Sequence, residues 1–144
     1  MRIVPICFLA ALLAGCQTGD DALTTSATPA AVTGQAASAI AGDMASRFAE
    51  QIGSPETTMI HLDNDETEYA TALEAALKGW GYTVTSENKT AKNQKTVDLA
   101  YSIDAFEGQI LSRLTAPSIA IARAYTKTAA GATPASPLSV MRRN

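Results

Sequence analysis

The chain is poor in the residues that build metal centres and disulfide frameworks. Its 144 residues include two cysteines and one histidine. A zinc site made of Cys and His needs three or four such ligands, and a disulfide-stapled domain needs more cysteines. Charged residues make up 17% of the chain and the net charge is −3, which argues against the concentrated basic face of a nucleic-acid binder. We therefore expect no metal, no cofactor and no direct contact with nucleic acid.

The sequence also lacks a recognisable catalytic framework. His61 is the single histidine, and a general base needs a nucleophile and an orienting group within reach. The chain holds no Gly-x-Ser-x-Gly frame. The acidic run over residues 63–68 begins like a calcium loop, but its sixth position is Glu68, where that loop needs glycine. We interpret His61 as structural and the acidic run as complementing a helix dipole, and we expect neither an enzyme nor a small-molecule substrate.

The one long apolar run lies at the start of the sequence. Arg2 is followed by an apolar stretch over residues 3–13 and then by small residues, which is the pattern of a secretory signal peptide. A stretch of about a dozen helical residues spans roughly 18 Å, short of the roughly 30 Å hydrocarbon core of a bilayer. The pattern therefore predicts a cleaved signal over residues 1–15 rather than a permanent membrane helix.

The end of this signal, Leu13-Ala14-Gly15-Cys16, resembles the bacterial lipobox at all of its positions. The resemblance implies cleavage between Gly15 and Cys16, a diacylglycerol group on the Cys16 thiol and an acyl chain on its new amine. Two or more acyl chains anchor a protein stably to a membrane. The alternative is an ordinary signal peptide that happens to contain a cysteine.

The residue after the predicted cleavage site bears on which membrane holds the anchor. In lipoproteins of Gram-negative bacteria, Asp after the lipidated cysteine commonly retains the protein in the inner membrane, and here the residue is Gln17. By similarity to that sorting pattern we expect the outer membrane, facing the periplasm. Residues 16–36 contain almost no large apolar side chains, so they cannot bury enough surface to fold. They are predicted to form a lipidated, flexible tether.

From residue 37 to 127 the patterning predicts an α+β periplasmic domain. Two amphipathic stripes, at residues 37–52 and 69–80, predict helices. Alternating or β-branched runs predict strands at residues 57–62, 82–85, 97–103, 110–114 and 119–125, with a hairpin loop at 87–96. The order α-β-α-β-β-β-β favours two helices packed on one face of a small antiparallel or mixed sheet.

Residues 128–144 are predicted to form a flexible C-terminal tail, whose first part is of low complexity. Its end combines three apolar side chains with two arginines, a short motif that could add as a strand to the sheet edge of a partner. The alternative is a frayed terminus. The candidate docking residues are Leu138, Val140, Met141, Arg142 and Arg143.

Two further clusters lie around the second predicted helix and the loop after it. Lys89, Lys92 and Lys95 form a small basic loop, which we interpret as solvated rather than as a site for a phosphate or an acidic partner. The aromatic side chains of this region are expected in the core, not in a stacking platform: Tyr69, Trp80 and Tyr82.

Taken in order, these features resemble TrbH, the small lipoprotein of conjugal-transfer (mating-pair formation) systems, a subset of type IV secretion. The resemblance covers nearly the whole chain and implies a non-enzymatic envelope component of the plasmid-transfer apparatus, anchored at Cys16 and associated with other channel subunits. A periplasmic binding or regulatory lipoprotein, such as an activator of a cell-wall enzyme, is the alternative. The resemblance rests on the lipobox, the helix over 37–52, Gly79-Trp80-Gly81-Tyr82, Arg123-Ala124-Tyr125 and the segment over 131–143.

Overall fold

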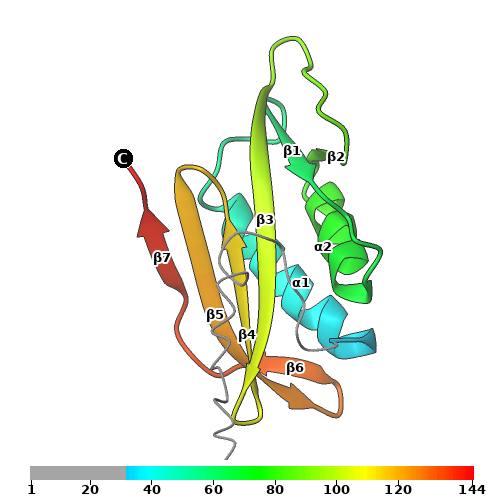
Figure 1. Cartoon of the computed structure of the whole chain (residues 1–144), viewed down its shortest axis with the longest axis vertical. Helices are drawn as coiled ribbons and strands as arrows, with labels where there is room; N and C mark the ends of the chain where they lie inside the picture. Colours follow the sequence, from blue (N-terminus) through cyan, green and yellow to red (C-terminus); the bar gives the residue numbers. More distant parts are fainter. Residues whose placement is uncertain (1–31) are drawn as a thin grey trace, which may run out of the picture.

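The computed structural model describes residues 32–144. The predicted signal peptide, the lipobox and most of the predicted tether fall on residues 1–31 and lie outside the described residues. Within 32–144 the chain forms two helices and a seven-stranded sheet (Figure 1). No helix in this range is long and apolar enough to cross a membrane.

Both helices form because an apolar stripe recurs at helical spacing. Helix α1 (Gly34–Ala49) buries Ile40, Met44 and Phe48 together with the alanines between them. Helix α2 (Glu68–Gly79) buries Tyr69, Leu73 and Leu77. The hydroxyl of Thr67 caps α2 by accepting a hydrogen bond from the backbone N–H of Ala70 at 3.1 Å. The amphipathic patterns therefore predicted both helices. Helix α1, however, begins at Gly34, inside the stretch expected as tether, and ends at Ala49, before Ile52.

The sheet is mixed, which confirms the α+β prediction. Its strand order is β2-β1-β3-β4-β5-β6, and β7 also pairs with β5. Strand β1 runs parallel to β2 and to β3, while the pairs from β3 onward are antiparallel. The strands are β1 (Thr58–Leu62), β2 (Thr83–Thr85), β3 (Lys95–Phe106), β4 (Gln109–Thr115), β5 (Ile119–Thr128), β6 (Gly131–Pro134) and β7 (Ser139–Arg142).

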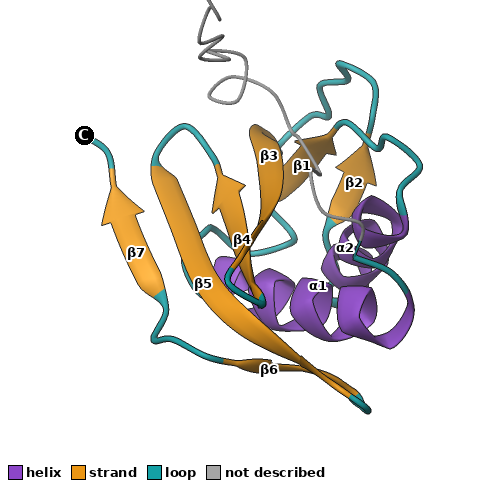
Figure 2. Cartoon of the chain, turned by 60° about the horizontal axis from the view of Figure 1, so that its bottom comes forward, coloured by secondary structure: helices purple, strands orange, loops and turns teal. Residues whose placement is uncertain are grey.

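The helices cover one face of the sheet and together with it enclose the core (Figure 2). Alternate residues of β3, β4 and β5 point into this core, for example Tyr101, Leu114 and Ile121. Their neighbours in the strands point to the opposite face, which no described element covers. The described part of the chain is therefore a two-layer sandwich whose sheet has one open face.

The prediction that residues 87–96 form a hairpin loop, joining two paired antiparallel strands, is wrong. Strands β2 and β3 do not pair with each other, because β1 lies between them and runs parallel to both. The segment 86–94 is therefore a crossover that runs from beside His61, near the end of β1, back to the start of that strand. Alternation along one strand predicts that strand but not its neighbour, which explains the error.

The structure also differs from the flexible tail expected from residue 128. Residues 131–134 and 139–142 form β6 and β7, and both pair antiparallel with β5. The long strand β5 would otherwise present a free edge, and its backbone groups gain partners from the tail. The low-complexity sequence of this segment did not predict these strands, because backbone pairing does not require alternation of apolar and polar residues.

Trp80 corrects a second expectation, because it is 51% exposed rather than part of the core. It follows the last turn of α2, where its backbone N–H bonds to the carbonyl of Ala76 at 3.2 Å. Tyr69 and Tyr82 are buried, as expected. Trp80 keeps helical backbone angles, with φ −79° and ψ −4°, and the chain leaves the helical path only at Gly81. Its exposure therefore comes from its place at the end of α2, beyond the last buried residue, Leu77.

Candidate functional site

The predicted site residues fall into two groups. Gly15 and Cys16 lie outside the described residues. The candidate docking residues 138–143 lie on or beside β7, the outermost strand on the β5 side of the sheet (Figure 1). We call the side of β7 that faces away from β5 the β7 edge, and the contacts that position it come from α1 and β5.

Asp43 of α1 anchors β5 beside the segment that leads to β7. Its Oδ2 atom accepts a hydrogen bond from the Arg123 guanidinium at 3.0 Å and from the Tyr125 hydroxyl at 2.6 Å. Burial and the hydrogen bond to Asp43 raise the pKa of Tyr125 well above its ordinary value. Tyr125 therefore stays a neutral donor, and Arg123 supplies the charge opposite Asp43.

The chain between β6 and β7 is held by the same part of β5. The Nε of Arg123 donates to the carbonyl of Ser136 at 3.0 Å. The hydroxyl of Ser136 accepts from the backbone N–H of Ala124 at 2.9 Å, and the N–H of Ala135 donates to the Ala124 carbonyl at 2.8 Å. These bonds explain structurally two motifs singled out in the sequence, the Arg-Ala-Tyr strand end and the segment after Gly131.

Strand β7 pairs with β5 on one side, and the structure describes no strand on its other side. Val140 is 42% exposed and Met141 is 61% exposed. The Arg142 guanidinium donates to the side-chain oxygen of Gln51 at 2.8 Å, a neutral partner. Within residues 32–144 neither Arg142 nor Arg143 forms an ion pair. The β7 edge therefore combines free backbone groups, exposed apolar side chains and unneutralised positive charge.

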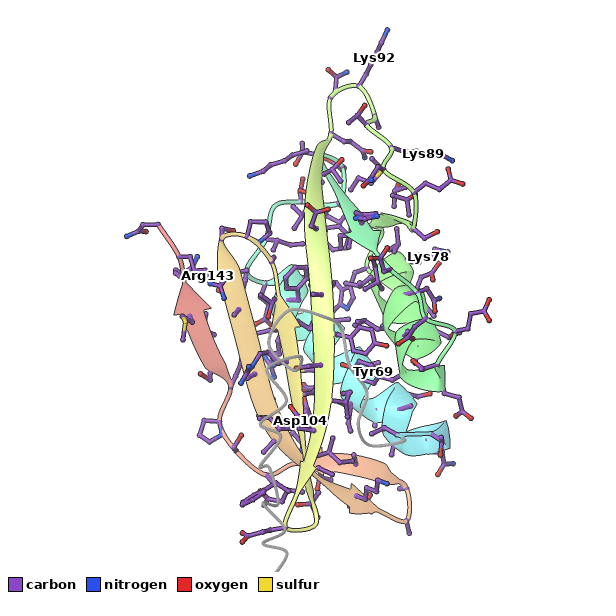
Figure 3. All side chains as sticks on the ribbon, in the orientation of Figure 1. Tyr69, Lys78, Lys89, Lys92, Asp104 and Arg143 are labelled. Carbon is purple, nitrogen blue, oxygen red and sulfur yellow. The ribbon has the colours of Figure 1, made fainter. Side chains whose placement is uncertain are left out.

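A hollow of about 600 Å³ borders the end of β7 and continues over the sheet. Arg143 lines it on one side, and three carboxylates and His61 line it elsewhere. Figure 3 places Arg143 just past the tip of β7. The carboxylates are Asp63, Asp65 and Asp98.

Two hydrogen-bonded groups fix the walls of this hollow. The Nδ1 atom of His61 lies 2.9 Å from Oδ1 of Asp98, and its Nε2 atom lies 3.4 Å from the carbonyl of Ser86. Burial raises the pKa of Asp65, but hydrogen bonds from Tyr101 and Thr67 outweigh it, so the pKa lies below its ordinary value. His61 thus joins β1 to β3 and to the crossover, and Asp65 joins the start of α2 to β3.

The partners of His61 and the spacing of the acidic side chains describe what this hollow contains. His61 has no nucleophilic partner among its hydrogen bonds, which go to a carboxylate and a carbonyl. Within residues 32–144 no group of three or more His, Cys, Asp or Glu side chains could hold a metal ion. The hollow is a surface feature beside β7, lined by carboxylates and by Arg143.

The lysine loop is spread out rather than gathered into a site. Lys89 forms an ion pair with Glu87 at 2.7 Å. Figure 3 shows Lys92 at the outer end of the loop, pointing into solvent and away from Lys89. The solvated interpretation therefore describes these side chains better than an anion-binding cluster.

The exposure of two aromatic side chains was not predicted from the sequence. Trp80 borders a shallow hollow of about 190 Å³ with Ile52 and Pro55. Phe106 is 72% exposed at the tip of the β3–β4 hairpin. The glycines on both sides of Trp80 were the available signal, since Gly81 takes a φ of +97° that ends the helical path.

Two comparisons with known proteins identify the same family. The family model described as "Conjugal transfer protein TrbH" matches residues 18–144. A protein of Sinorhizobium fredii (strain NBRC 101917 / NGR234), named "Probable conjugal transfer protein TrbH", is 61% identical over 148 residues and covers 100% of both chains. No solved structure matches this chain.

Proposed function

The chain belongs to the TrbH family of conjugal transfer proteins, and on this premise we propose that it is a lipid-anchored structural component of the plasmid-transfer apparatus. The observation that carries the proposal is the combination of this family match over residues 18–144 with a complete lipobox ending at Cys16. The protein would hold its α+β domain at the membrane, where transfer subunits bind it.

The anchor in this proposal is the lipid on Cys16. Burial of an acyl chain contributes about 0.8 kcal/mol per CH₂, and two or more chains make attachment stable. Gln17 favours delivery to the outer membrane, with the domain in the periplasm. Cys16 would therefore decide the attachment of the domain, and the residue after it would decide which membrane holds it.

The accessory role is supported by the surfaces of the domain. His61 bonds to a carboxylate and a carbonyl, and Asp65 accepts hydrogen bonds from the hydroxyls of Thr67 and Tyr101, so these groups join neighbouring elements of the domain. The open sheet face and the β7 edge present backbone and side chains suited to another protein. We therefore propose a non-enzymatic function, carried out through binding.

Replacing Cys16 by Ser tests the anchor. We expect C16S to lose incorporation of labelled palmitate, to leave the membrane fraction and to lower plasmid transfer at least a hundredfold. Cys7→Ser is the matched control, because Cys7 lies in the predicted signal and should leave with it. Normal labelling or normal transfer by C16S would contradict the proposal. Gln17→Asp should shift the protein to the inner-membrane fraction without loss of label.

A further inference from the structure

We propose that the β7 edge binds an extended acidic segment of another protein, which adds to the sheet as a strand beside β7. The inference deepens the proposed function by naming the surface on which a partner would bind, and it rests on that function only for the partner's place in the transfer apparatus. Four features of β7 carry it.

The first feature is the direction of the backbone groups. The N–H of Arg143 donates to the carbonyl of Ser118 on the β5 side at 2.9 Å. Because N–H groups alternate in direction along a strand, the amides of Arg142 and Val140 point away from β5. A row of such groups is the template for strand addition.

The second feature is the side chains beside this edge. Val140 lies opposite buried Ile121 and so on the helix side, and Met141 lies opposite Ala120 on the open side. Both keep a large part of their surface exposed next to the free edge. An incoming strand with apolar side chains on either face would cover them, which adds hydrophobic stabilisation to its backbone bonds.

The third feature is charge, and it identifies the kind of partner. Arg142 and Arg143 form no ion pair within residues 32–144. The register places Arg142 opposite buried Ile119 and so on the helix side, and Arg143 follows it at the end of β7. An acidic strand beside β7 neutralises these two arginines, whereas a second copy pairing β7 with β7 would bring further arginines to them.

The fourth feature is the contrast with the other edge of the sheet. Strand β2 offers three residues, Thr83–Thr85, and Val84 packs against the core. Glu66 and Glu74 line the hollow beside it together with Thr85. That edge is shorter and its three residues include no arginine, whereas β7 ends at Arg142 and is followed by Arg143. An acidic strand therefore favours β7.

Peptide binding to the full chain, purified in detergent, tests the proposal directly. The probe is a labelled seven-residue peptide in which valine alternates with glutamate, and its control carries lysine in place of glutamate. We expect the glutamate peptide to bind at least tenfold more tightly by fluorescence anisotropy. Its binding should slow hydrogen exchange at the amides of Val140 and Arg142.

Variants of β7 separate backbone addition from charge. Val140→Pro removes an amide that points away from β5, so it should abolish peptide binding and leave the melting temperature within about 2 °C. Arg142→Glu with Arg143→Glu should reverse the preference toward the lysine peptide. Lys127→Glu, an exposed charge reversal near the far end of β5, is the matched control and should change binding less than twofold.

Three results would overturn the proposal. One is equal binding of the two peptides. Another is exchange protection at Thr83–Thr85 instead of Val140 and Arg142. The third is a sedimenting dimer that Val140→Pro converts to monomer, which would make a second copy the occupant. None of these results depends on lipid at Cys16, so the two proposals can fail separately.

Discussion

At the residue scale, one carboxylate joins parts of the chain that are far apart in sequence. Asp43 of α1 binds Arg123 and Tyr125 of β5, and Arg123 in turn holds the carbonyl of Ser136 before β7. Asp43 and Arg123 are 80 residues apart, so no local pattern could have paired them. The sequence marked Arg123 and Tyr125 as a motif, but their role required the fold.

Asp43→Ala should destabilise the protein by about 2–3 kcal/mol, because it leaves the half-buried Arg123 guanidinium without its counter-charge. Urea unfolding measures this loss. Glu50→Ala is the control, since it breaks only the exposed ion pair with Arg47 and should cost less than about 1 kcal/mol. Equal effects of the two substitutions would show that the Asp43 contacts contribute no more than a surface pair.

At the element scale, β6 matters because it packs against the start of α1. Gly131, its first residue, has a φ of +141°, and a Cβ atom there would lie 3.1 Å from the carbonyl oxygen of Gln35 and 3.3 Å from the Cβ of Ala39. Glycine is therefore required both by the backbone conformation and by the close approach of the helix. The contact fixes where the tail leaves β5.

Gly131→Ala should cost about 2 kcal/mol or more, because strain in the backbone adds to the clash with α1. Gly108→Ala is the matched control: its φ is +79°, but nothing lies within 4 Å of the added Cβ. It should cost about 1 kcal/mol from the backbone alone. Thermal unfolding of both variants provides the comparison, and a cost at Gly131 no larger than at Gly108 would rule out the steric contribution.

The elements differ in how far the sequence could predict them. Helices α1 and α2 and strand β3 carry strong periodicity, and their buried residues followed from it. The pairing of β1 between β2 and β3 did not, because register and neighbours depend on contacts across the fold. For β7, the composition of the segment indicated a docking motif. It did not indicate that the segment pairs with β5 and so extends the chain's own sheet.

At the scale of the whole molecule, the two faces of the sheet have different roles. The helix side contains the core, and the other side is open in the described structure. On neighbouring strands, Leu114 lies opposite Ile121 in the core, and Arg113 lies opposite Ala122 on the open face. Adjacent positions on one strand should therefore respond very differently to substitution.

Ala122→Glu should change the free energy of unfolding by no more than about 1 kcal/mol and can stabilise the protein, because the new carboxylate faces Arg113 across the strands. Leu114→Ala should cost about 2–5 kcal/mol, since it opens a cavity in the core. Both are measured by urea unfolding. A loss of several kcal/mol in Ala122→Glu would mean that the open face is covered in the native protein.

The parallel pairing of β1 with β3 has a consequence for the order of folding. Strands β3 to β7 are joined by short connections, so they can pair with one another rapidly. Strand β1 pairs with β3 only after α2 and the crossover between them have been synthesised. Before β3 has been synthesised, β1 therefore has only the three-residue strand β2 to pair with. A protein that emerges amino end first could pack α1 only against α2 during that time. The part of α1 that faces β4, β5 and β6 would stay exposed, and this interval is when a chaperone would have most to protect.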